Sequence, residues 1–180
     1  MEKDRTTMKQ TMLVVILLTA LLGAAFGQGN TKQTSSSPEA VGAQQSAPTS
    51  AQAKQIEAMV NKAAALVNSN GKAAFAEFRN KGSEWWTGNI YLFVYDLKSN
   101  VLLNPAFPQR EGTNTTGQKD ANGKLFHHEF IKIVESQGSG WVDYMFPKPG
   151  QSQPSQKWSY VKAVTIDGTQ GLIGAGFYPE

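Results

Sequence analysis

The hydrophobic pattern of this chain changes its period at Gly88, and this change limits the folds open to it. Before Gly88, apolar residues recur at helical spacing over residues 56–67, and Asn70-Gly71 supplies a helix stop. After Gly88, residues 91–95 alternate between two faces that are both apolar. Such a strand is expected at the centre of a sheet. The pattern therefore predicts an amphipathic N-terminal helix followed by a sheet.

The remaining segments complete an α+β pattern. Residues 72–80 and 125–137 have the spacing of two further helices. Beside the central strand, four more strands are expected at residues 101–104, 141–146, 157–166 and 172–178. Residues 105–123 form a long connection, a kind of segment that is more often functional than idle. Five largely antiparallel strands with helices packed on one side make an α+β, PAS-like fold.

Residues 1–27 have the layout of a secretory signal peptide. Three basic residues precede an apolar run at residues 12–25, which is shorter than the about 20 residues of a spanning helix. Small residues at Ala25 and Gly27 predict cleavage before Gln28. We therefore expect a periplasmic or secreted protein, with a retained inner-membrane anchor as the alternative.

Residues 28–52 contain no aromatic residue, and Val41 is their only sizeable hydrophobe. Such a segment buries too little apolar surface to offset the entropy lost on ordering. We expect a disordered linker here, and a single domain over residues 53–180.

Composition and motifs argue against several classes of protein. The chain has no cysteine, which excludes a lipoprotein anchor, disulfides, thiolate zinc sites and thiol catalysis. Its 17 basic and 14 acidic residues are dispersed, so nucleic acid is not an expected partner. Neither a Gly-x-Ser-x-Gly elbow, nor a phosphate-binding loop, nor a His-Glu-x-x-His motif is present. We expect no enzyme and no cofactor, with a carboxylate-pair hydrolase or lyase as a remote alternative.

Several short segments together resemble a known family. They are Ala-Phe-Ala-Glu-Phe at residues 74–78, Gly-Asn-Ile-Tyr-Leu-Phe-Val-Tyr-Asp at 88–96, Gly-Thr-Asn at 112–114, Lys-Asp-Ala-Asn-Gly-Lys at 119–124, Gly-Trp-Val-Asp-Tyr at 140–144, Lys-Trp-Ser-Tyr-Val at 157–161 and Gly-Ala-Gly-Phe-Tyr at 174–178. In order and spacing they resemble the single Cache domain, an extracytoplasmic PAS-like sensor domain. The resemblance covers residues 53–179. It implies a pocket for a small organic molecule, commonly a carboxylate, on the open face of the sheet. Asn104 departs from the family, which commonly has a histidine before this proline.

Polar groups among aromatic strands are candidates for lining such a pocket. The candidate ligand-binding residues are Lys157, Tyr144, Tyr160, Arg110, Trp86, Tyr91 and Phe93. The resemblance favours Lys157 as the partner of a ligand carboxylate, against a solvated strand end. For Tyr144 and Tyr160 the alternative is a core tyrosine with its hydroxyl at the surface. Arg110 could bind an anion through two parallel hydrogen bonds. The alternative for Arg110 is a solvated arginine in a loop.

Two features invite a metal interpretation, and neither supports it. His127 and His128 are adjacent on an expected helix and lack a second pair of ligands, so two surface histidines are expected. Residues 119–123 lack the oxygen ligands and terminal Glu of a calcium loop. We expect no metal site. Trp141 is expected to plug the core beside the N-terminal helix.

The sequence thus predicts an exported sensor-type domain that binds a small organic molecule, with a carboxylate as the expected class of ligand. No helix follows the domain, so signalling is expected to need a partner, such as a membrane sensor protein. Two alternatives remain: a structural or adaptor domain that docks on a membrane sensor, and an anchored sensory subunit if the leader is retained. The sequence does not fix the oligomeric state.

Overall fold

The computed structural model describes residues 46–179, so the predicted leader and most of the predicted linker lie outside the described residues. The elements of this part, in chain order, are α1 (Ala51–Asn70), η1 (Gly71–Ala74), α2 (Phe75–Phe78), β1 (Trp86–Thr87), β2 (Ile90–Asp96), β3 (Val101–Leu103), η2 (Pro108–Arg110), α3 (Phe126–Gln137), β4 (Ser139–Pro147), β5 (Pro154–Ile166) and β6 (Thr169–Phe177).

The helix α1 begins slightly earlier than the sequence predicts. Ser50 caps it, because its Oγ accepts a hydrogen bond from the Ala53 backbone N at 3.1 Å. Residues 51–52, which the linker prediction included, are therefore helical. The helix ends where the sequence predicts, at Gly71, whose φ of 57° is in the region that favours glycine.

The strands form one antiparallel sheet in the order β1-β2-β6-β5-β4, with β3 also paired to β2. The α+β prediction with a long N-terminal helix is confirmed, and β2 lies inside the sheet as its two apolar faces indicate. The described residues contain six strands, where five were predicted. The additional strand, β1, has two residues, too few to produce an alternating pattern.

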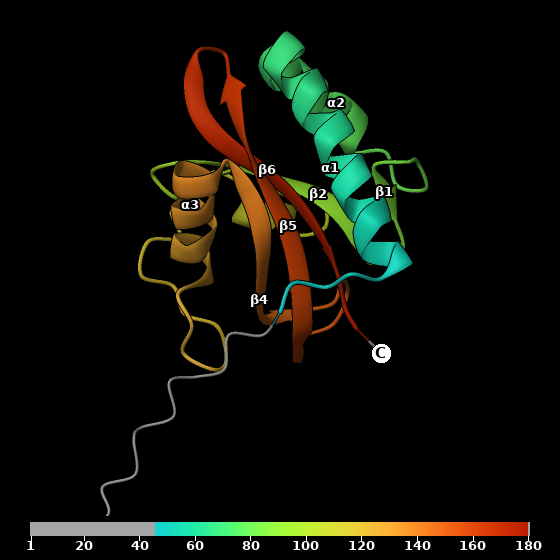
Figure 1. The fold of residues 1–180 in the computed structure, drawn as a ribbon, viewed down its shortest axis with the longest axis vertical. Coiled ribbons are helices and arrows are strands. Elements are labelled where there is room, and N and C mark those ends of the chain that lie inside the picture. Colours follow the sequence, from blue (N-terminus) through green and yellow to red (C-terminus); the bar gives the residue numbers. More distant parts are fainter. Residues whose placement is uncertain (1–45, 180) are drawn as a thin grey trace, which may run out of the picture. The chain divides into compact units, whose positions relative to one another are not determined.

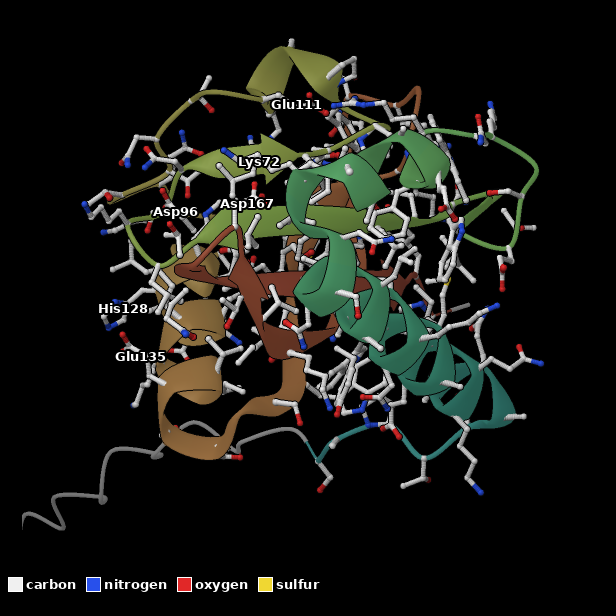
Figure 2. All side chains as sticks on the ribbon, turned by 90° about the horizontal axis from the view of Figure 1, so that it is seen from above. Lys72, Asp96, Glu111, His128, Glu135 and Asp167 are labelled. Carbon is white, nitrogen blue, oxygen red and sulfur yellow. The ribbon has the colours of Figure 1, made fainter. Side chains whose placement is uncertain are left out.

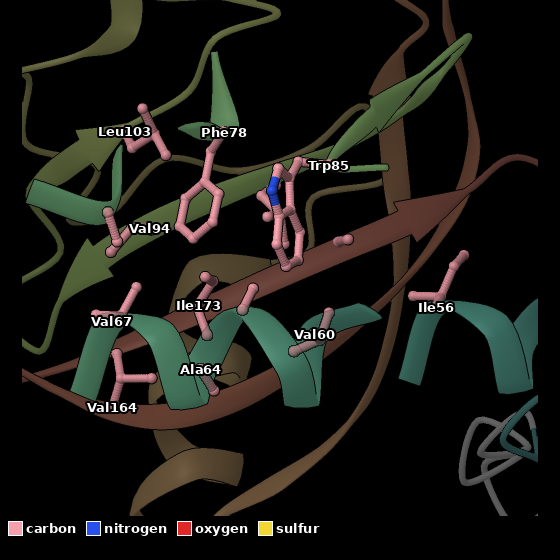
Figure 3. Packing of buried hydrophobic residues seen from close by; sticks show 14 of the residues in the cluster. Ile56, Val60, Ala64, Val67, Phe78, Trp85, Val94, Leu103, Val164 and Ile173 are labelled. Carbon is pink, nitrogen blue, oxygen red and sulfur yellow. The ribbon is translucent and has the colours of Figure 1, made fainter. Parts of the chain in front are cut away.

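Helices cover both faces of the sheet, which corrects the expectation of helices on one side (Figure 1). On the α1 face, Leu92 and Val94 of β2 belong to one core with α1 and with Phe78 of α2. Figure 3 shows Val94 and Phe78 in this core. On the α3 face, Phe93 and Tyr95 of the same strand pack with α3. The two faces arise from the alternation of side chains along the strands.

Trp141 lies beside α1, as the sequence predicts, but it is only partly buried and does not fill the core. Its ring packs against the core on the α1 face, and its indole Nε1 donates a hydrogen bond to Glu57 Oε1 at 2.7 Å. This contact fixes β4 against the first half of α1 and leaves the α3 face to other side chains.

Candidate functional site

Lys157 is at the centre of a group of aromatic side chains on the α3 face. It lies opposite Tyr144 in the register of β4 and β5, and 1% of its surface is exposed. Its ammonium donates a hydrogen bond to the Tyr91 hydroxyl at 3.0 Å and lies 4.2 Å from the centroid of that ring. Three further ring centroids lie 5.3–5.8 Å from Nζ, those of Phe93, Phe146 and Tyr178. We call Lys157 and these four rings the lysine cage.

The charge of Lys157 is not balanced by a carboxylate within residues 46–179, where the ion pairs join other residues. Cation–π contacts with the cage and the bond to Tyr91 stabilise the ammonium in part. Burial nevertheless lowers the pKa of Lys157 to about 7. A buried charge is costly unless it is paired and hydrogen-bonded, so this cation is suited to an anionic partner.

Tyr144 lies beside the lysine cage and is held firmly. Its ring stacks on Phe126 of α3 with centroids 4.2 Å apart, and its hydroxyl lies 3.0 Å from Ser159 Oγ. Burial raises the pKa of both Tyr144 and Tyr91 well above the ordinary value. Both hydroxyls are therefore neutral and able to donate hydrogen bonds at physiological pH.

Arg110 approaches the cage from η2, in the loop between β3 and α3. Its Nη2 lies 3.1 Å from Gln118 Oε1 and 3.3 Å from His127 Nε2. Its Cζ lies 5.5 Å from the ring centroid of Phe146, and Lys157 Nζ lies 5.3 Å from the same centroid. Two cations thus adjoin one ring, and neither has a carboxylate partner in the described part of the chain.

His127 is buried, which corrects the expectation that both histidines lie at the surface; His128 is exposed. His127 Nε2 also lies 3.4 Å from the Tyr95 hydroxyl. Because the Arg110 guanidinium can only donate, we assign Nε2 as the acceptor and the ring proton to Nδ1. Burial, and then the charge of Arg110, lower the pKa of His127 to about 3. The ring is therefore neutral and adds no charge to the group.

Trp86 and Tyr160 lie on opposite faces of the sheet. Trp86 is half-buried and pairs with Tyr91 across β1 and β2, so its side chain is on the face of the lysine cage. Tyr160 is three residues from Lys157 on the same strand, and an odd spacing reverses the face. Its hydroxyl donates to Ser139 Oγ at 2.8 Å on the α1 face. The structure does not bring Tyr160 to Lys157, and we leave it out of the site.

Unsatisfied hydrogen-bonding atoms around the site are all donors. Three buried side-chain nitrogen atoms lack a partner among residues 46–179: Trp86 Nε1, Arg110 Nε and, with the tautomer assigned above, the protonated His127 Nδ1. Buried polar atoms are almost always paired in folded proteins. This part of the molecule therefore has more donors than acceptors.

Two hollows adjoin the group. One, of about 330 Å³, is lined by His127, His128 and residues 115–118 of the loop. The other, of about 300 Å³, is lined by Tyr144 with side chains that include Lys124 and Gln156. These volumes are at the lower end of those of small-molecule sites. A larger hollow of about 470 Å³ lies beside Trp85 on the α1 side and contains none of the predicted site residues.

Sequence reasoning missed several side chains of this group. Phe146 and Ser159 are two residues from Tyr144 and Lys157 on their strands, so strand alternation was a usable signal for both. His127 and Phe107 gave no comparable signal. Phe107 lies in an irregular loop, yet its ring contacts Tyr91 and Phe146, with centroids 6.0 and 5.2 Å apart respectively.

Comparison with known families gives this arrangement a context. A family model described as a Cache domain matches residues 43–180. The chain belongs to the Cache domain family. The predicted resemblance is thereby confirmed, and so is the PAS-like sensory character that it implies.

This Cache domain is similar to sensory proteins of bacteria. It is 31% identical over 90 residues to the methyl-accepting chemotaxis protein McpP of Pseudomonas putida, covering 50% of this chain and 16% of McpP. It is 32% identical over 88 residues to the sensor histidine kinase MctS of Rhizobium johnstonii, covering 49% of this chain and 18% of MctS. The matches therefore span less than a fifth of the length of either relative.

A solved structure gives a longer match. It is that of a Cache chemosensory domain that recognises carboxylic acids, with a TM-score of 0.62 and 26% identity, covering 72% of this chain and 95% of the other. Within residues 46–179 of the present chain, no helix is both long and apolar enough to cross a membrane. The same residues hold no group of three or more histidine or acidic side chains placed to bind a metal ion.

Proposed function

We propose that this Cache domain reversibly binds a small carboxylate outside the cytoplasm and that Lys157 provides the compensating charge. The observation that carries the proposal is a fully buried ammonium without a carboxylate partner in the described chain. Tyr91 and Tyr144 would donate hydrogen bonds to the ligand, and Arg110, Trp86 and Phe93 would complete its surroundings.

The chemistry of the neighbouring groups supports an anionic ligand over a cationic one. Arg110 and the protonated form of Lys157, whose pKa is about 7, are the cations. His127 and the buried tyrosines are neutral, and the unpaired nitrogen atoms are donors. A carboxylate supplies a negative charge and two acceptor oxygen atoms, which are the features that this group lacks. An amine would meet two like charges and an excess of donors.

The relatives support a sensory role. One relative is a chemotaxis protein and another a sensor kinase, and the domain of similar structure recognises carboxylic acids. We infer that ligand occupancy in this chain is passed to a membrane sensor protein, and that the domain has no catalytic activity.

A melting screen tests the proposal. The purified protein would be heated with acetate, propionate and butyrate, and in parallel with the amides of the same acids. A ligand that binds only the folded state raises stability by about 2.7 kcal/mol at a hundred times its Kd. We expect acids to raise the melting temperature and the uncharged amides to leave it unchanged. Equal effects of acid and amide, or no effect of any acid in this and a wider carboxylate panel, would refute the proposal.

A further inference from the structure

The Glu111 carboxylate joins the end of α2 to the loop that follows β3. Arg79, directly after α2, donates to both of its oxygen atoms, from Nη1 at 2.9 Å and from Nη2 at 2.7 Å. The backbone N of Asn104, directly after β3, donates to Glu111 Oε1 at 2.8 Å. Hydrogen bonds from Arg79 lower the pKa of Glu111, so the carboxylate is charged at physiological pH. Figure 2 shows Glu111 beside the helical segment that follows α1.

The segment that Glu111 anchors carries two groups of the candidate site. Arg110 is its neighbour in the chain, and Phe107 contacts the rings of Tyr91 and Phe146 in the lysine cage. Phe107 is itself tied to Asn104, because its backbone N donates to the Asn104 side-chain oxygen at 3.2 Å. Movement of the loop at Glu111 would therefore shift both side chains relative to Lys157.

The ion pair connects the two faces of the sheet. Phe78, the residue before Arg79, is fully buried in the core on the α1 face, whereas Arg110 adjoins Phe146 on the α3 face. We infer that Arg79 and Glu111 are positioning residues, which hold the loop of residues 104–113 against the lysine cage and couple its position to α2. The ligand-holding role of the loop rests on the proposed function. The coupling between the loop and α2 does not depend on that function.

A two-way effect is required if the pair couples these elements. Removal of either partner breaks the same pair, so loss of Arg79 should loosen the loop and loss of Glu111 should loosen α2, because coupling free energies are reciprocal. A bidentate arginine–carboxylate pair has the geometry for this role, since it fixes direction as well as distance. By contrast, a surface ion pair without this geometry usually contributes little to stability.

Hydrogen exchange on the ligand-free protein tests the inference from both sides. Arg79→Met removes the guanidinium without altering the loop sequence, and we expect amide exchange over residues 104–113 to rise about three- to tenfold. Glu111→Gln removes the charge but keeps an oxygen that Asn104 can bond, and we expect faster exchange over residues 75–80. Arg79→Lys, which keeps the charge without the fork, should lie between Arg79→Met and the unaltered protein.

The control is Lys62→Met, which breaks the exposed ion pair of Lys62 with Glu84, 2.6 Å long and made by residues outside the loop. It should leave exchange over residues 104–113 within about twofold of the unaltered protein. Loop exchange that is unchanged in Arg79→Met, or an effect no larger than that of the control, overturns the inference. Because no ligand is needed, failure of the carboxylate proposal would not affect this result.

Discussion

At the scale of single residues, the main feature is a lysine whose burial and charge oppose each other. Lys157 keeps one hydrogen bond, to Tyr91, and several ring contacts, and these do not replace the water that it loses. Burial lowers its pKa from the ordinary 10.5 to about 7. The folded protein therefore releases a proton that the unfolded chain retains between these two pH values.

The pH dependence of stability follows from this difference. Where the unfolded state binds more protons, stability increases with pH. Relative to Lys157→Met, the unaltered protein should gain stability from pH 7 to pH 9, by at most about 1.4 kcal/mol per pH unit. Urea denaturation at a series of pH values measures this. Lys162→Met, on the same strand but on the α1 face, is the control and should follow the unaltered protein. A constant difference between the unaltered protein and Lys157→Met would contradict the account.

The residue scale also shows what the sequence could and could not predict about the site. Lys157 and Tyr160 are an odd number of positions apart, and strand alternation alone would have separated them. The pairing of Arg110 with His127 had no such signal, because it joins an irregular loop to a helix start. Interactions without a period are found only when the fold is known.

At the scale of elements, α1 shows how a boundary depends on one side chain. Ser50 Oγ accepts a hydrogen bond from the Ala53 backbone N. Without this bond, that N–H of the first turn would have no partner within the helix. We expect Ser50→Ala to reduce the free energy of unfolding by about 0.5–2 kcal/mol, measured in urea. Thr49→Ala, one residue outside the cap, is the control. Equal stability of the two variants would show that the cap does not stabilise α1.

The strands were predictable to different degrees. The pattern of β2 predicted its place inside the sheet, since both of its faces are buried. The two residues of β1 were not predictable, because pairing with β2 defines that strand and its own pattern does not. Nor did the sequence reveal that α3 covers the face opposite α1, because the helical period gives the apolar stripe of a helix but not the layer that it covers.

At the scale of the whole molecule, the two faces of the sheet differ in the side chains that they carry. Its α1 face packs one core of aliphatic and aromatic side chains, and its α3 face packs a second core that surrounds Lys157, Tyr91 and Tyr144. The Arg79–Glu111 pair is the contact through which we infer that the two sides communicate.

The export prediction concerns residues outside the described part of the chain. If residues 1–27 are a cleaved signal peptide, the exported protein begins at Gln28, since small residues precede that position. Intact-mass measurement of protein recovered from outside the cytoplasm should show the loss of these residues. A mass that includes them would instead indicate a retained anchor.

The central claim is that Lys157 provides the charge for a bound carboxylate. Lys157→Met keeps most of the bulk of the side chain and removes the ammonium, so it separates charge from packing. Calorimetric titration with the carboxylate that gives the largest shift in the melting screen is the direct measurement. We predict that Lys157→Met binds it at least about tenfold more weakly, a loss of about 1.4 kcal/mol, and that Lys162→Met binds it as the unaltered protein does. Unchanged affinity in a folded Lys157→Met variant would contradict the claim and would indicate that Arg110 provides the charge instead.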